Sequence, residues 1–169
     1  MKVDGEDCEV NIFYLHTDPR VAARYHNDKH VVKMILESAQ MLSTAHRELD
    51  DDVDDILYRS THKNHPSTKW ARENITNYMW LYFLFEALCD EYTHRYGKVH
   101  LTDQKLRDIL QHNPKNISSD SSFIQPPQCM PDEYKVEGNS VKAYRNYYMG
   151  EKSGLAKWSK RRKLLWWKI

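Results

Sequence analysis

Cysteine is scarce in this chain, and long apolar runs are absent. Three cysteines occur in 169 residues, and none forms a Cys-x-x-Cys pair, which argues against a disulfide framework and a cysteine zinc site. The longest apolar stretch, residues 78–85, is far shorter than the roughly 18 residues that span a membrane. The first ten residues contain four acids and lack the apolar core of a signal peptide. We therefore expect a cytoplasmic protein with no membrane partner.

Charge is strongly segregated although the net charge is only +1. Residues 48–55 contain six acids, whereas residues 157–168 contain six basic residues, no acid and three tryptophans. Cations mixed with aromatic rings are typical of surfaces that bind phosphates and stacked bases. A solvated, poorly ordered terminus is the alternative interpretation of the same segment.

Apolar periodicity predicts an all-α fold, because apolar residues recur at helical spacing along most of the chain. Expected helix starts are Asp18 as a cap followed by Pro19, Pro66 with Ser67, Thr102 with Asp103, and Ser140. Gly97 is expected to end the second helix. The predicted helices span residues 19–46, 66–97, 104–112 and 140–151.

The second predicted helix belongs at the centre of the fold. Residues 78–88 are apolar on nearly every side, as in a helix surrounded by other elements. We expect one compact helical domain over residues 11–156, preceded by an extension of residues 1–10 and followed by a basic, Trp-rich tail of residues 157–169. The irregular stretch 113–139 is long enough to be functional or mobile.

The first predicted helix carries a polar ridge. His26, His30, Lys33 and Glu37 project within about 60° of one another, opposite the apolar stripe. Such a ridge combines bases, an amine and an acid, which are the groups used in proton transfer. The alternative is a solvated helix face on which Glu37 pairs loosely with Lys33.

Asp28 projects onto the apolar stripe of the same helix. A carboxylate that faces a core is costly unless it is paired, and burial raises its pKa into a range that suits proton transfer. The alternative interpretation is that Asp28 is a buried aspartate without a catalytic role, held by a histidine or by backbone amides.

A second cluster, residues 62–66 (HKNHP), directly precedes a helix start. Free backbone N–H groups and the positive end of the helix dipole favour a phosphate at such a position. Trp70 and Arg72 offer a ring and a cation one turn further on. The alternative is that His65 or Asn64 caps the helix and that Trp70 is core. Paired histidines are spaced for chelation, but H-E-x-x-H is absent, and we expect neither a metal nor another cofactor.

A third cluster lies in the last predicted helix. Arg145, Tyr147 and Lys152 fit a surface that stacks on bases and contacts phosphates. Tyr144 and Tyr148 share a face with Val141 and are expected to be partly core.

The order of these motifs resembles the pyrimidine-dimer DNA glycosylases of the phage endonuclease V type. A short extended start precedes an Ala-x-Tyr segment, and a Lys-Asn-His-Pro helix opening, a Glu-x-x-x-Arg-Tyr-Gly helix end and a Tyr-x-x-Tyr-Tyr-x-Gly-x-Lys segment follow. In this chain they are residues 11–15, 23–25, 63–66, 91–97 and 144–152. The chain is also similar to a group of small phage proteins.

The resemblance implies a nucleophile supplied by the chain's own N-terminal amine, assisted by an acid on the first helix. That acid falls at Asn27 or Asp28, and Lys29 or Lys33 is a possible substitute amine. It implies a DNA glycosylase, with or without lyase activity, that acts as a monomer on duplex DNA with a flipped damaged or modified pyrimidine. The alternatives are a phage DNA base-modifying transferase and a non-catalytic DNA-binding accessory protein. A viral source would place the protein in the cytoplasm of an infected bacterium.

The candidate residues fall into two sets. The candidate catalytic residues are Asp28, His30, Lys33, Glu37 and His65. The candidate DNA contacts are His26, Lys29, His62, Lys63, Asn64, Trp70, Arg72, Arg145, Tyr147, Lys152, Trp158, Lys160, Arg161 and Arg162.

Overall fold

The computed structural model describes residues 10–151, 154 and 156–167 and confirms the all-α prediction over these residues. Among them no helix is long and apolar enough to cross a membrane. The elements are α1 (Pro19–Tyr25), α2 (Asp28–Leu49), α3 (Pro66–Ala71), α4 (Ile75–Tyr96), α5 (Leu101–Leu110), the 3₁₀ turn η2 (Asp132–Tyr134) and α6 (Ser140–Glu151).

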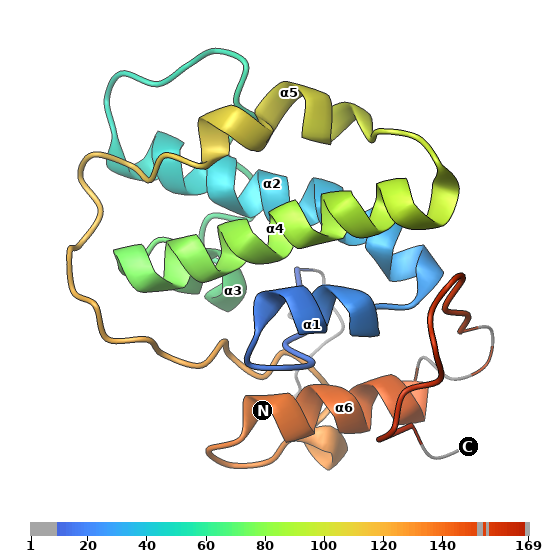
Figure 1. Ribbon diagram of the computed structural model, residues 1–169. Coiled ribbons are helices and arrows are strands. Elements are labelled where there is room, and N and C mark those ends of the chain that lie inside the picture. The colour runs from blue at the N-terminus through green and yellow to red at the C-terminus, as the bar shows by residue number, and fades with distance from the viewer. Residues whose placement is uncertain (1–9, 152–153, 155, 168–169) are drawn as a thin grey trace.

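Helix α4 lies at the centre of the molecule, as predicted (Figure 1). It packs most extensively against α2 and α1, and α3 and α5 also contact it. Tyr78, Leu81, Phe85 and Leu88 are fully buried along it. Burial on several sides explains why this helix is apolar around most of its circumference.

The first predicted helix is in fact two helices, and the prediction of one continuous helix was wrong. The break falls at His26 and Asn27, where the Asn27 side chain accepts a hydrogen bond of 2.9 Å from the His30 N–H. A capping asparagine satisfies backbone donors at a helix start and competes with helix continuation. Because α1 and α2 bury similar stripes, the apolar period runs across the break.

The second predicted helix is divided for the same reason. α3 ends at Ala71 and α4 begins at Ile75, where the Asn74 side chain accepts a hydrogen bond of 2.8 Å from the Asn77 N–H. Asparagine therefore interrupts both long helical patterns.

The boundaries of α1 and α4 were predicted correctly at Asp18 and Gly97, whereas the capping residues of α5 and α6 were not. Asp18 caps α1, and Gly97 ends α4 with a φ of 70°, which favours glycine. Helix α5 begins at Leu101 and is capped by His100 instead of Thr102. Helix α6 begins at residue 140 as expected, but Asn139 accepts the capping hydrogen bond.

The long stretch 113–139 runs down one side of the molecule from α5 to α6 (Figure 1). It is held to the helices by side-chain hydrogen bonds to its backbone: the Trp70 indole donates to the Ile124 carbonyl at 2.7 Å, and Asn74 donates to the Ser122 carbonyl at 2.9 Å. These bonds fix the segment in place. Residues 123, 125, 138 and 139 of it line an open groove on the surface of the molecule.

Candidate active site

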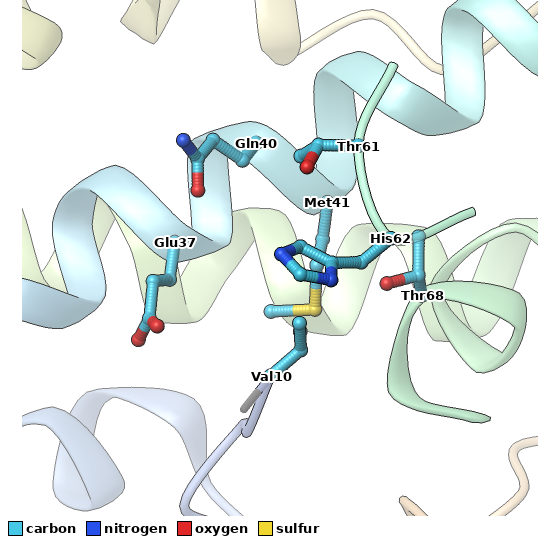
Figure 2. A pocket seen from close by; sticks show the side chains of 7 residues that line it. All are labelled: Val10, Glu37, Gln40, Met41, Thr61, His62 and Thr68. Atoms are coloured by element: carbon cyan, nitrogen blue, oxygen red, sulfur yellow. The ribbon is translucent and has the colours of Figure 1, made fainter. Parts of the chain in front are cut away.

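A small cavity of about 40 Å³ lies where α2 meets the connector before α3 and the start of the described chain (Figure 2). A space of this size holds one to about three water molecules and cannot enclose a whole base. Its lining residues are Val10, Glu37, Gln40, Met41, Thr61, His62 and Thr68.

Glu37 supplies the carboxyl group of the cavity. Its side chain is only 18 % exposed, and burial raises its pKa, against the opposing effects of Lys33 and His62. The Lys33 ammonium lies 3.9 Å from the carboxylate, which confirms the predicted pairing. A carboxyl group with a raised pKa beside an imidazole is suited to exchanging protons with a substrate.

His62 is held in an uncommon backbone conformation. Its φ is 47°, in the left-handed region that non-glycine residues rarely adopt. Two hydrogen bonds hold this turn: the N–H of the preceding Thr61 donates to the Thr44 hydroxyl on α2 at 3.1 Å, and the His62 carbonyl accepts from the His65 N–H at 2.9 Å. The strained turn places the imidazole between Glu37 and Thr68 in the view of Figure 2.

His65 caps α3, which confirms one of the two capping residues that the sequence suggested. Its Nδ1 accepts a hydrogen bond of 3.1 Å from the Ser67 N–H. The cap fixes the connector from its far end, so His65 supports the position of His62.

Thr68 lines the same cavity from α3 and was not predicted. Among the described residues its buried hydroxyl has no hydrogen-bond partner. A buried hydroxyl without a partner is costly, and water or a substrate group in the cavity would satisfy it. Gln40 and Thr61 were also missed, because no sequence pattern distinguishes them from ordinary helix and loop residues.

The predicted polar ridge is only half correct, because its two histidines are buried. His26 is fully buried, its Nδ1 lies 2.6 Å from the Ala22 carbonyl, and burial lowers its pKa to about 4. The Nδ1 atom of His30 lies 2.7 Å from the Tyr148 hydroxyl, and the imidazole stacks on the Phe13 ring with 4.3 Å between the ring centroids. The break between α1 and α2 turns both rings inward, away from the exposed Lys33.

Asp28 has a pKa opposite to the one predicted. Burial opposes its ionisation, but hydrogen bonds from Ser159 and the ion pair with Arg95 outweigh burial and lower the pKa. The carboxylate accepts from the Ser159 N–H at 2.9 Å, from the Ser159 hydroxyl at 2.5 Å and from Arg95 at 3.0 Å. The predicted backbone-amide contact is therefore present in the Ser159 N–H, and the Ser159 hydroxyl and Arg95 take the place of the predicted histidine.

The described part of the basic tail docks on the helical domain. Arg161 pairs with Glu91, which also pairs with Arg95, and the Lys160 ammonium donates to the His94 carbonyl at 3.1 Å. The Trp158 indole donates to the Tyr25 carbonyl at 2.7 Å. The described tail residues thus contact the helical domain through both charged and aromatic side chains. Lys160 and Arg161 contact protein, whereas Arg162 is exposed.

The remaining predicted DNA contacts divide by burial. Trp70 is 4 % exposed and is a core residue, so it offers no surface for stacking. Arg72 donates to the Lys63 carbonyl at 2.6 Å. Tyr147 packs between the Phe13 and Tyr134 rings. Those at the surface are Lys29, Lys63 and Asn64, and Lys152 lies outside the described residues.

Comparison with known proteins identifies a family. The sequence model of a family described as pyrimidine dimer DNA glycosylase matches residues 10–105, more than half of the chain. The matched region contains every residue that lines the cavity. No curated protein and no solved structure matches the chain.

Proposed function

The chain belongs to the pyrimidine dimer DNA glycosylase family, and on that premise we propose that it cleaves the glycosidic bond of a damaged or modified pyrimidine at the cavity between α2 and residues 61–68. The observation that carries the proposal is Glu37, an acid with a raised pKa that shares the cavity with His62 inside the matched region. Family membership supports a DNA glycosylase function, and the cavity supports this location for the chemistry.

The size of the cavity suggests how the substrate lies. A base inside a duplex is inaccessible, so the target nucleotide must be extruded. The cavity of about 40 Å³ has room for water and not for the base. The sugar C1′ therefore lies at the cavity mouth, with the base outside and a water molecule inside.

The proposed reaction uses Glu37 as the general base. The carboxylate takes a proton from the water, the water oxygen bonds to C1′, and the C1′–N1 bond breaks with its electron pair leaving on the pyrimidine. His62 gives a proton to the departing base. Lys33, whose side chain is 56 % exposed at the rim, contacts a phosphate next to the extruded nucleotide.

Other candidate residues have supporting parts in this proposal. His30 fixes the start of α2 through Tyr148, and His65 fixes the connector that carries His62. Asp28 binds Ser159 of the docked tail and Arg95 of α4, and so joins the tail to the helical domain.

Incubation with three duplexes tests the proposal. They carry a pyrimidine dimer, a uracil or a modified thymine, and cleavage of the glycosidic bond in one of them is expected, detected as an abasic site that hot alkali converts into a strand break. No alkali-labile site in any of the three duplexes would refute the proposal.

Borohydride added during the reaction tests the nucleophile separately. Attack by water forms no imine and leaves no covalent adduct. A trapped adduct, mapped by peptide mass spectrometry, would instead assign the attack to an amine such as Lys33.

A further inference from the structure

A second concave surface lies apart from the cavity. It is an open groove of about 590 Å³ bounded by the segment before α1, residues 123–125 and the first half of α6. Tyr14, His16, Phe123, Asn139 and Arg145 are among its lining residues. No residue lines both the groove and the cavity.

Arg145 brings a cation without a counterion to this groove. Its Nε donates to the Leu15 carbonyl at 2.9 Å, and its guanidinium lies over the Tyr25 and Trp166 rings at 5.7 and 5.1 Å from their centroids. No carboxylate pairs with it among the described residues. Its terminal nitrogens make no hydrogen bond to the described residues. Such a half-buried, oriented guanidinium suits a phosphate, which accepts paired N–H donors.

His16 adds a second donor on the same groove. Its Nδ1 accepts a hydrogen bond of 2.9 Å from the Asp18 N–H. The neutral ring therefore carries its proton on Nε2. The Tyr25 ring, whose centroid lies 5.8 Å from the imidazole centroid at an interplanar angle of 79°, helps to orient it.

Phe123 provides an aromatic surface next to these donors. The residue is 38 % exposed, and its other side is supported by Trp70, Trp80 and Tyr14 at centroid distances of 6.0, 6.3 and 6.2 Å. A ring fixed in this way can stack on an unpaired base of any sequence.

We propose that this groove binds a nucleotide, with the phosphate on Arg145 and His16 and the unstacked base on Phe123. The proposal rests on the proposed function in one respect: a protein that acts on DNA meets such nucleotides in its substrate. The nucleotide has two possible sources, an unpaired position in a DNA strand or a free mononucleotide, and both share this chemistry.

Titration calorimetry with lesion-free ligands tests the groove. The ligands are a short oligothymidylate, thymidine 5′-monophosphate, thymidine and inorganic phosphate. Arg145→Gln should weaken oligothymidylate binding about 10- to 100-fold, as expected for loss of charge-assisted hydrogen bonds. The matched control Lys142→Gln removes an exposed charge from the same helix and should change affinity little.

Phe123→Ala keeps the test informative if Arg145→Gln fails to fold. Loss of one stacked base should weaken oligothymidylate binding by about fivefold or more, with inorganic phosphate affected little. Tighter binding of the oligothymidylate than of the monophosphate would assign the site to a DNA strand, and equal binding would assign it to a free nucleotide.

Three results would overturn the inference. They are an equal effect of Arg145→Gln and Lys142→Gln, phosphate binding as tight as nucleotide binding, or no effect of Phe123→Ala. Failure of the proposed function is separate, because it concerns glycosidic-bond cleavage at Glu37. The Glu37→Gln variant should bind oligothymidylate like the wild-type protein.

Discussion

Replacing Asp28 with asparagine should loosen the docked tail. The Asp28 carboxylate joins Ser159 of the tail to Arg95 of α4, whose side chain is fully buried. Asparagine has nearly the same shape but no charge, so both partners lose a charged acceptor. Arg95 keeps its ion pair with Glu91, which limits the loss.

The expected loss of stability is about 2 kcal/mol, the usual worth of a hydrogen bond to a charged group. For a chain of this size that corresponds to a fall in Tm of about 4–8 °C. The loss depends on pH in a defined direction. Because the folded pKa of Asp28 is lowered from 3.8, its contribution is complete above that pH and disappears as pH falls through the folded pKa.

Thermal unfolding followed by circular dichroism from pH 7 to pH 3 measures this directly. Asp55→Asn, which removes an exposed acid, is the matched control. Limited trypsin digestion should also cleave Asp28→Asn sooner between residues 157 and 163. Equal Tm values for wild type and Asp28→Asn at pH 7, or a difference that is as large at pH 3 as at pH 7, would refute the assignment.

Three further predictions concern buried histidine, tyrosine and the exposed tail cations. The His26 ring should titrate near pH 4 in NMR spectra. Because the pKa is lower in the folded than in the unfolded protein, protonation of this histidine should cost roughly 3 kcal/mol of stability as pH falls from 6.5 to 4. A titration midpoint near 6.5 would contradict its burial. Tyr148→Phe leaves the Asn27 N–H and a buried histidine nitrogen without their partner, so urea unfolding should show a loss of about 1–3 kcal/mol, and an unchanged midpoint would be evidence against these bonds. Replacing Arg162 and Lys163 with glutamine should reduce the salt slope of duplex binding, measured by fluorescence anisotropy, by about 2, whereas an unchanged slope would show that neither contacts phosphate.

Local signals predicted much of the fold. A cap followed by proline marked the start of α1, glycine marked the end of α4, and unbroken apolarity placed α4 at the centre. The two helix breaks were missed because Asn27 and Asn74 act over three residues, whereas the apolar stripes on either side continue in phase.

The site was harder to predict because its properties depend on distant contacts. Glu37 and His62 were both singled out, but their sharing of a cavity depends on the packing of α2 against the connector before α3. The pKa of Asp28 depends on Ser159, which lies 131 residues away in the sequence. A helical projection cannot include such partners, and it therefore assigned the raised pKa to Asp28 instead of Glu37.

The most direct test of the proposed chemistry is the single-turnover rate of glycosidic-bond cleavage by Glu37→Gln, on whichever duplex the wild-type protein cleaves. Glutamine keeps the shape of the side chain but cannot take the proton of the attacking water. The rate should fall about 10²- to 10⁴-fold, while the exposed control Glu73→Gln keeps the wild-type rate. A Glu37→Gln rate equal to that of wild type would contradict the assignment of catalysis to this cavity.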